Sequence, residues 1–235
     1  MDNPTDPSKL DRRHRLPSLA LALTLLVAGA ALGQSGSGQK PVYITEKLPY
    51  LDVVHNGQKV RIERIQDNGN RLIDDYSRTS RPCPPFCLHP NQIAPKVDTF
   101  AELEVLEFLR TEVKSGSGLL IDTRLPEFYR AETIPTATNI PFTVLNTDNP
   151  NVERILTALG GVKTDGKTGG KWQFQHAKTL GLFCNGAYCD STPRAITRLL
   201  ALGYPPEKLK YYRGGMQMWR LQGLTTVSAE KASSQ

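Results

Sequence analysis

Two short apolar runs stand out in the second half of the chain. Residues 119–122 read LLID behind a Gly/Ser turn, and residues 179–183 read TLGLF. Runs of this length without polar alternation are typical of strands that are buried on both faces, as in a parallel sheet. Both runs end at polar residues, so we expect each strand to lead into a loop at the same edge of a sheet.

Helical periodicity precedes the first run. Thr99 and Glu102 have the spacing of a capping box, in which each side chain binds the other residue's backbone amide at a helix start. The apolar positions that follow fall on one helical face: Phe100, Leu103, Leu106 and Leu109. The pattern predicts an amphipathic helix with Thr99 at its N-cap.

Two further helices alternate with the strands. One covers residues 152–159 and is stopped by a Gly-Gly pair, and the other opens at Thr192, has Pro193 at its first position and ends at Gly203. This alternation predicts an α/β domain with a mainly parallel sheet that is covered by helices on both faces. Ligands of such domains bind beyond the carboxyl ends of the strands.

The pattern changes upstream of this domain. Residues 42–65 mix β-branched residues with an Asn-Gly turn, which predicts a hairpin. The stretch RPCPPFCLHP at 81–90 is too rich in proline for a helix or a central strand, so it is expected to cross the surface as a rigid connector. We therefore predict a small β appendage with its connector at 41–90 and the main domain at 97–227. The Gly/Lys-rich residues 161–171 are expected to form an exposed loop, and residues 228–235 a disordered tail.

The N-terminus has the order of a targeting signal. A basic stretch at 12–15 precedes an apolar run from 16 to 32 that ends in small residues. We expect residues 1–33 to be a signal peptide, followed by a linker at 34–40, and the mature chain to be periplasmic. The alternative is a retained membrane anchor, because the run approaches the ~20 residues that a membrane span needs. Only in that case is the membrane an expected partner.

Composition and charge narrow the range of partners. The chain has a formal net charge of +6, with 39% hydrophobic and 22% charged residues, which fits a globular protein with polar flanks. The positive excess attracts small anions. Because no long basic run is interleaved with aromatic residues, no nucleic-acid partner is expected.

The four cysteines fall into two close pairs. Cys83 and Cys87 lie in the connector and are predicted to form a structural disulfide, since an exported chain meets an oxidising compartment. The alternative is that they offer soft ligands to copper together with His89. Cys184 and Cys189 form the second pair, and the sequence alone does not choose among the three possible pairings of four cysteines.

Cys184 stands between the second apolar run and a helix start. Unpaired backbone amides and the helix dipole favour an anion there, so the pattern predicts a lowered pKa for Cys184 and a nucleophilic sulfur. The alternative is a buried structural cysteine. Two interpretations of Cys189 stay open: it forms a reversible disulfide with Cys184, or it fills space.

Taken in order, four stretches resemble the rhodanese family: DTR at 122–124 followed by EF, IPTA at 134–137 followed by NIP, the cysteine loop CNGAYC at 184–189, and YRGGM at 212–216 followed by Trp219. The resemblance covers residues 97–227 and implies a mainly parallel five-stranded sheet. The loop departs from the family's usual pattern, because Gly186 comes one position early and Cys189 replaces a common arginine. Asp190 stands where the related phosphatases need an arginine for phosphate, which argues against that activity.

The resemblance implies a sulfurtransferase that holds sulfur as a persulfide on Cys184. The donor would be thiosulfate or a persulfide and the acceptor a thiol or a cyanide-like molecule, with no metal and no organic cofactor. Arg124 is expected to pair with Asp122 as loop scaffold and is also a candidate substrate contact. The full set of candidate substrate-binding residues is Asn185, Gly186, Ala187, Tyr188, Cys189, Arg124 and Arg213.

Two other functions remain open at this point. One is an exported thiol-disulfide redox protein that uses Cys184 and Cys189. The other is a non-catalytic rhodanese module that binds another exported protein, with residues 42–65 as the contact surface.

Overall fold

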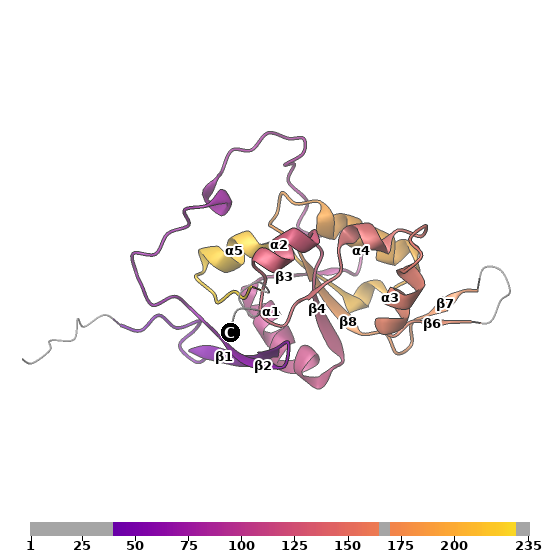
Figure 1. The fold of residues 1–235 in the computed structure, drawn as a ribbon, viewed down its shortest axis with the longest axis horizontal. Coiled ribbons are helices and arrows are strands. Elements are labelled where there is room, and N and C mark those ends of the chain that lie inside the picture. The colour runs from indigo at the N-terminus through magenta and orange to yellow at the C-terminus, as the bar shows by residue number, and fades with distance from the viewer. Residues whose placement is uncertain (1–39, 165–169, 229–235) are drawn as a thin grey trace, which may run out of the picture. The chain divides into compact units, whose positions relative to one another are not determined.

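The computed structural model describes residues 40–164 and 170–228, which belong to one compact unit (Figure 1). The predicted signal segment, nearly all of the predicted linker and nearly all of the predicted C-terminal tail lie outside these residues. Within the described ranges, no helix is both long and apolar enough to span a membrane.

A five-stranded sheet forms the centre of the domain. Its strands lie in the order β3 (Asp98–Phe100), β9 (Leu209–Tyr212), β8 (Thr179–Phe183), β4 (Gly118–Asp122) and β5 (Thr138–Asn139). Every neighbouring pair is parallel. The predicted parallel five-stranded sheet is therefore confirmed, and β8 and β4 are the two apolar runs of the sequence.

Helices cover both faces of this sheet (Figure 1). Helices α3 (Val152–Ala158) and α4 (Ser191–Ala201) contribute to the core on one face. Helix α1 (Glu102–Phe108), its π-helical continuation η2 (Leu109–Val113) and helix α5 (Gly215–Leu221) contribute to the core on the other. The shorter helical segments are η1 (Asp75–Ser77), α2 (Pro126–Ala131), η3 (Phe142–Leu145) and η4 (Pro206–Lys208).

Alternation along the strands divides the core between the two faces. In β4, Ile121 packs with α3 and α4 while Leu120 packs with α1 and α5. Tyr211 and Tyr212 of β9 divide in the same way, as the period of two in a strand requires. Trp219 has no exposed surface, so the apolar residues of α5 anchor that helix against the sheet.

The first helix begins later than the sequence predicts. Thr99 lies in β3, where it pairs with Tyr211, and α1 starts at Glu102 behind Ala101. The side chain of Glu104 accepts a hydrogen bond from the Ala101 amide at 3.0 Å. The predicted capping box at Thr99 and Glu102 is wrong, because pairing with β9 recruits Thr99 into the sheet.

The predicted hairpin is present as β1 (Tyr50–His55) and β2 (Gln58–Glu63). Its turn places Asn56 and Gly57 at φ of 49° and 79°, the left-handed region that favours this dipeptide in tight hairpins. Leu51 and Ile62 are buried in the same core cluster as α1 and α5. The hairpin therefore helps to close one face of the sheet.

The Gly/Lys-rich stretch 161–171 is predicted to be an exposed loop, and its residues 165–169 lie outside the described residues. Val162–Lys163 (β6) and Trp172–Gln173 (β7) pair as short antiparallel strands. Gly160 ends the preceding helix at φ 90°, where a Cβ atom would lie 2.5 Å from the His176 carbonyl oxygen. The expected helix stop at this glycine is confirmed.

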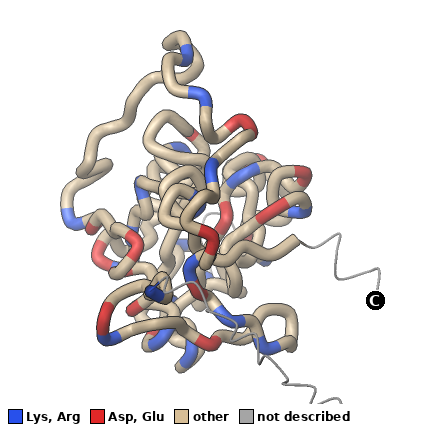
Figure 2. Tube along the Cα trace, turned by 90° about the vertical axis from the view of Figure 1, so that its left-hand side faces the viewer, with Lys and Arg blue, Asp and Glu red and all other residues tan. Residues whose placement is uncertain are grey.

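Charged residues of both signs are interspersed over the described chain (Figure 2). Several of them form exposed pairs, such as Arg61 with Asp52 and Arg110 with Glu107. Exposed pairs of this kind contribute little to stability. A buried pair beside the cysteine loop behaves differently and belongs to the site described next.

Candidate functional site

The candidate site lies where β4 and β8 end side by side. The two strands pair in parallel with Asp122 opposite Phe183, so the residues that follow them emerge at the same edge of the sheet. The Thr123 amide continues the ladder by donating to the Phe183 carbonyl at 3.0 Å. Cys184 is the first residue after β8 and is only 2% exposed.

The segment from Cys184 to Cys189 curls back on itself before α4 begins. The Cys184 thiol donates to the Cys189 carbonyl oxygen at 3.3 Å. The Cys189 amide donates to the Gly186 carbonyl at 2.9 Å, which closes the turn. The two ends of the loop therefore meet, and the Cys184 sulfur lies beneath them.

The start of α5 holds the backbone of this loop. The amides of Met216 and Gln217 donate to the carbonyls of Cys184 and Asn185 at 3.0 and 2.9 Å. Gly215 makes this close approach possible, because its φ is 55° and a Cβ atom would lie 2.3 Å from the Cys184 carbonyl oxygen. The close contact with the loop therefore requires glycine at this position.

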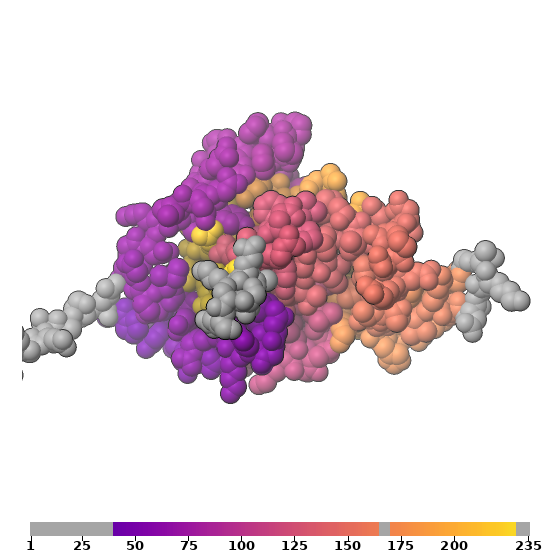
Figure 3. Space-filling view, in the orientation of Figure 1, coloured from indigo at the N-terminus to yellow at the C-terminus, as the bar shows by residue number. Residues whose placement is uncertain are grey.

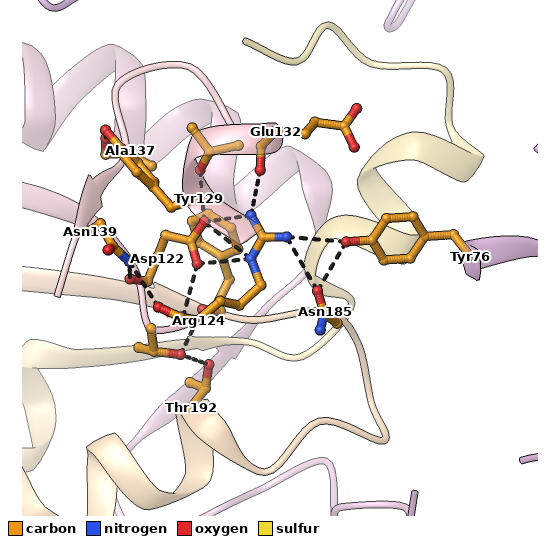
Figure 4. Close-up of polar contacts among 12 residues, drawn as sticks. Tyr76, Asp122, Arg124, Tyr129, Glu132, Ala137, Asn139, Asn185 and Thr192 are labelled. Atoms are coloured by element: carbon orange, nitrogen blue, oxygen red, sulfur yellow. Dashed lines mark hydrogen bonds and ion pairs between the residues drawn. The ribbon is translucent and has the colours of Figure 1, made fainter. Parts of the chain in front are cut away.

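A buried ion pair supports the loop from the end of β4 (Figure 4). Arg124 Nη2 lies 2.6 Å from Asp122 Oδ2, and the two side chains are 2% and 0% exposed. Asp122 also accepts from the Arg124 amide at 3.0 Å and from the Thr133 hydroxyl at 2.8 Å. Arg124 Nη1 lies 3.2 Å from Asn185 Oδ1, so the pair is linked directly to the cysteine loop.

Two buried threonines connect β4 to α4. The Thr123 hydroxyl lies 2.8 Å from the Thr192 hydroxyl and donates to the Phe183 carbonyl at 2.9 Å. Helix α4 begins at Ser191 behind Asp190, so the predicted start, with Thr192 as the cap and Pro193 at the first position, is two residues too late. Thr192 is engaged with Thr123 instead of capping the helix.

A segment from outside the sheet covers the loop. We call residues 74–89 the strap. The Tyr76 hydroxyl donates to Asn185 Oδ1 at 2.9 Å and accepts from Arg124 Nη1 at 3.1 Å. The Gln217 side chain donates to the Tyr76 carbonyl at 3.1 Å, and the His89 amide donates to the Ala187 carbonyl at 2.9 Å. Both ends of the strap are thus fixed to the loop or to α5.

An aromatic contact fastens the middle of the strap. Phe86 packs edge-on against Tyr188 of the loop with ring centroids 5.9 Å apart, and Arg81 lies over both rings. Arg81 also pairs with Asp75 at 2.9 Å. In Figure 3 the purple atoms of this part of the chain run along the upper edge of the molecule, beside the orange and yellow atoms of the C-terminal elements.

With this geometry in place, a protein-family model described as a rhodanese-like domain matches residues 105–222. That span is half of the chain and contains the ion pair, the cysteine loop and the start of α5. The chain belongs to the rhodanese-like domain family. The strap precedes the residues that match the family model.

Several solved structures are similar to this rhodanese-like chain. A rhodanese from E. coli is 26% identical, with a TM-score of 0.30 and coverage of 47% of this chain and 98% of that one. A human single-domain sulfurtransferase is 22% identical, with a TM-score of 0.34 and coverage of 55% and 98%. The thiosulfate sulfurtransferase from Pseudomonas aeruginosa is 19% identical, with a TM-score of 0.38 and coverage of 57% and 20%. A comparison with curated protein sequences gave no match.

In the rhodanese-like domain, the pKa values of the two loop thiols are shifted in opposite directions. Burial raises the pKa of Cys184 well above its ordinary value, and a hydrogen bond with Cys189 acts in the same direction. The hydrogen bond with Cys184 lowers the pKa of Cys189 to about 6, helped by bonds from Asn185 and Ser191. The sequence predicted a lowered pKa for Cys184. That prediction is wrong for the covered loop, because the loss of water around Cys184 outweighs the Thr192 hydrogen bonds that lower its pKa.

The predicted site residues do not all gather around Cys184. The five residues from Asn185 to Cys189 share its loop, and Arg124 reaches that loop with its donors committed to Asp122, Asn185, Tyr76 and the Glu132 carbonyl. Arg213 donates to the His89 carbonyl at 2.8 and 3.0 Å, so it holds the strap.

Cys83 and Cys87 have Cα atoms 4.6 Å apart, a separation that a disulfide spans, and their disulfide stays a prediction.

Sequence reasoning missed Tyr76 and Gln217. Neither lies in a periodic segment or a motif, so no local pattern singles them out. The one available signal was the connector itself, since a rigid proline-rich segment must pack against some part of the domain surface.

Proposed function

We propose that this chain is a sulfurtransferase that carries sulfane sulfur as a persulfide on Cys184. The observation that carries the proposal is the position of Cys184 as the first residue after β8, in a loop held by the amides of α5. A thiol at this place is fixed relative to the backbone amides of its loop, which can stabilise the charge of a bound persulfide. Membership of the rhodanese-like family supports the same chemistry.

The proposed reaction has two steps. The Cys184 thiolate attacks the outer sulfur of thiosulfate, the sulfur-sulfur bond of the donor breaks, and sulfite leaves with the electron pair. A thiolate or cyanide then attacks the outer sulfur of the persulfide, and Cys184 leaves as a thiolate. A persulfide donor would enter through the same first step, with its thiolate as the leaving group. Only the chain's own cysteine and the two substrates take part.

Access to Cys184 requires movement of its cover. Cys184 is 2% exposed, in a loop that the strap contacts at Asn185, Ala187 and Tyr188, so a donor reaches the thiol when this cover opens. Opening also brings water to the thiol and removes the burial that raises its pKa. The thiolate is therefore favoured in the open form, where the donor binds.

The first test is turnover of thiosulfate and cyanide to thiocyanate and sulfite. Cys184→Ser is expected to reduce the rate to that of the uncatalysed mixture, whereas Cys189→Ser retains transfer to cyanide. Equal loss in both variants would favour a second candidate, thiol-disulfide exchange by the two loop cysteines, since the Cys184 thiol already reaches the Cys189 carbonyl oxygen at 3.3 Å. No transfer by the parent chain, together with a stable protein complex, would favour a non-catalytic interaction module.

The proposed compartment is the periplasm. This proposal rests on the basic and apolar stretches at the N-terminus, which lie outside the described residues. The donor and acceptor would accordingly be small anions and thiols present in that compartment.

A further inference from the structure

A second thiol shares the loop of Cys184. Among the described residues, Cys184 and Cys189 are the cysteines that no disulfide engages, and Cys83 and Cys87 lie next to each other in the strap. The Cys184 thiol already reaches the Cys189 backbone at 3.3 Å. The turn that closes between Cys189 and Gly186 brings the first and last residues of the loop together.

The surroundings of the two thiols are unequal. Cys184 is buried, whereas Cys189 keeps partial access to solvent. The adjacent carboxylate of Asp190 is paired with Arg194 at 2.7 Å, so its negative charge is partly neutralised. The hydrogen bond with Cys184 and bonds from Asn185 and Ser191 stabilise a thiolate on Cys189, whose pKa falls to about 6. Before sulfur is bound, Cys189 is therefore the more readily ionised of the two thiols. Once Cys184 carries sulfur its own thiol proton is gone, and the bonds from Asn185 and Ser191 are those that still favour a thiolate on Cys189.

We propose that Cys189 is a resolving residue, which discharges a persulfide on Cys184 from within the closed loop. The inference rests on the proposed function, because it requires a sulfur to arrive on Cys184. It gives that sulfur a second fate in addition to transfer to an external acceptor, namely release as hydrosulfide.

The step is a thiol-disulfide exchange with a persulfide. The Cys189 thiolate attacks Cys184 Sγ, a disulfide bond forms between the two residues, and the bond from Cys184 Sγ to the outer sulfur breaks. The outer sulfur leaves as hydrosulfide with that bond's electron pair and with the proton of the persulfide. The sulfane sulfur is reduced, and the two cysteine thiols are oxidised to a disulfide.

A thiol reductant completes the cycle. A small thiol attacks the loop disulfide to give a mixed disulfide, a second thiol releases its oxidised dimer, and both loop cysteines return to the thiol form. The net reaction takes thiosulfate and two thiols to sulfite, hydrogen sulfide and one disulfide. The substrate class assigned to this route is therefore a thiosulfate-type donor with a small thiol as reductant.

The closed geometry favours an internal nucleophile over an external one. Cys184 is only 2% exposed, which shields a persulfide there from thiols in solution. Cys189 belongs to the same loop, and the Cys184 thiol reaches its carbonyl oxygen at 3.3 Å, so this nucleophile does not have to enter from solution. Burial also favours the neutral form of the persulfide, the form in which hydrosulfide is a good leaving group.

The test follows the sulfur after one exposure to thiosulfate in the absence of added thiol. The parent chain, with Cys184 and Cys189 initially reduced, is compared with Cys189→Ser and with Cys189→Ala as a second substitution. Hydrosulfide in solution, intact mass and peptide mapping are measured together. The control is the double variant Cys83→Ser/Cys87→Ser, which removes the other cysteine pair.

The parent chain and the control are expected to release one hydrosulfide per chain and to gain a disulfide between Cys184 and Cys189. Both Cys189 variants are expected to keep the added sulfur on Cys184 until cyanide removes it. An equally lasting persulfide in the parent chain, with no hydrosulfide and no loop disulfide, overturns the inference and leaves the proposed function intact. Sulfur found on Cys189 also overturns it. Absence of added sulfur from every chain, variants included, overturns the proposed function and the inference with it.

Discussion

The ends of β4 and β8 lie side by side at one edge of the sheet and serve different purposes. After β4, the charges of Asp122 and Arg124 are buried, paired and hydrogen-bonded to their surroundings. After β8, two thiols share a loop in which the Cys184 thiol donates to the Cys189 carbonyl oxygen at 3.3 Å. The comparison indicates a rigid framework at one strand end that holds a reactive loop at the other.

The largest expected effect comes from breaking the framework. Asp122→Asn leaves the Arg124 guanidinium buried without a counter-charge, so it should lower the free energy of unfolding by about 3–5 kcal/mol. The matched control is Asp52→Asn, which disrupts the exposed pair with Arg61 and should cost less than about 1 kcal/mol. Urea unfolding of both variants measures the difference. Equal losses of unfolding free energy in the two variants would show that the buried pair does not stabilise the fold more than the exposed pair does.

The next effect comes from the contact between α5 and the loop. Gly215→Ala imposes a side chain at φ 55° and places its Cβ 2.3 Å from the Cys184 carbonyl. We expect a loss of about 2–4 kcal/mol, from backbone strain and steric overlap together. Gly203→Ala has a comparable φ of 87° but its nearest neighbour is 3.7 Å away, so it should lose only about 1 kcal/mol. If both variants lose the same free energy of unfolding in urea, the short distance between a Cβ at position 215 and the Cys184 carbonyl adds nothing to the destabilisation.

The pKa of Cys189 provides a test of the loop that follows β8. Its pKa of about 6 means that alkylation by iodoacetamide should level off above that pH. One pH unit below the pKa, the thiolate fraction and the rate should fall about tenfold. Ser191→Ala removes one of the hydrogen bonds that lower this pKa and should move the midpoint upward. A rate that keeps rising from neutral pH towards pH 9 would show that the thiol is unperturbed.

The smallest effect concerns the link between the strap and both strand ends. Burial raises the pKa of Tyr76, so its hydroxyl stays protonated and donates to Asn185. Tyr76→Phe should weaken closure of the strap by about 1 kcal/mol. Labelling of Cys184 by a small thiol reagent would then accelerate about fivefold if the strap limits access. Tyr43→Phe, at a half-exposed tyrosine, is the control, and equal labelling rates in the two variants would rule out a covering role for Tyr76.

The central strands and the hairpin could be predicted because their signals are local. The apolar runs at β4 and β8 and the Asn-Gly turn of the hairpin each specify a conformation within a few residues. The start of α1 could not be predicted in this way. Thr99 and Glu102 have the spacing of a cap, but the pairing of Thr99 with Tyr211 depends on a strand that lies more than a hundred residues later.

The cysteine loop could be predicted in position but not in electrostatics. Its place between a strand and a helix followed from the sequence, and so did the pairing of Asp122 with Arg124. The pKa of Cys184 depends on how deeply the folded chain buries it, and the Tyr76 hydroxyl that binds the loop lies 109 residues before its partner Asn185. The role of Arg213 could not be predicted either, because its hydrogen-bond acceptor, the His89 carbonyl, is brought to it by the folded strap.

The most direct test of the account is the mass of the peptide that contains Cys184 after brief exposure of the folded chain to thiosulfate. The measurement is best made on Cys189→Ser, in which no second loop thiol can remove the sulfur. The account predicts a gain of one sulfur on Cys184 that cyanide removes as thiocyanate. A folded variant that gains no sulfur on Cys184 would contradict it.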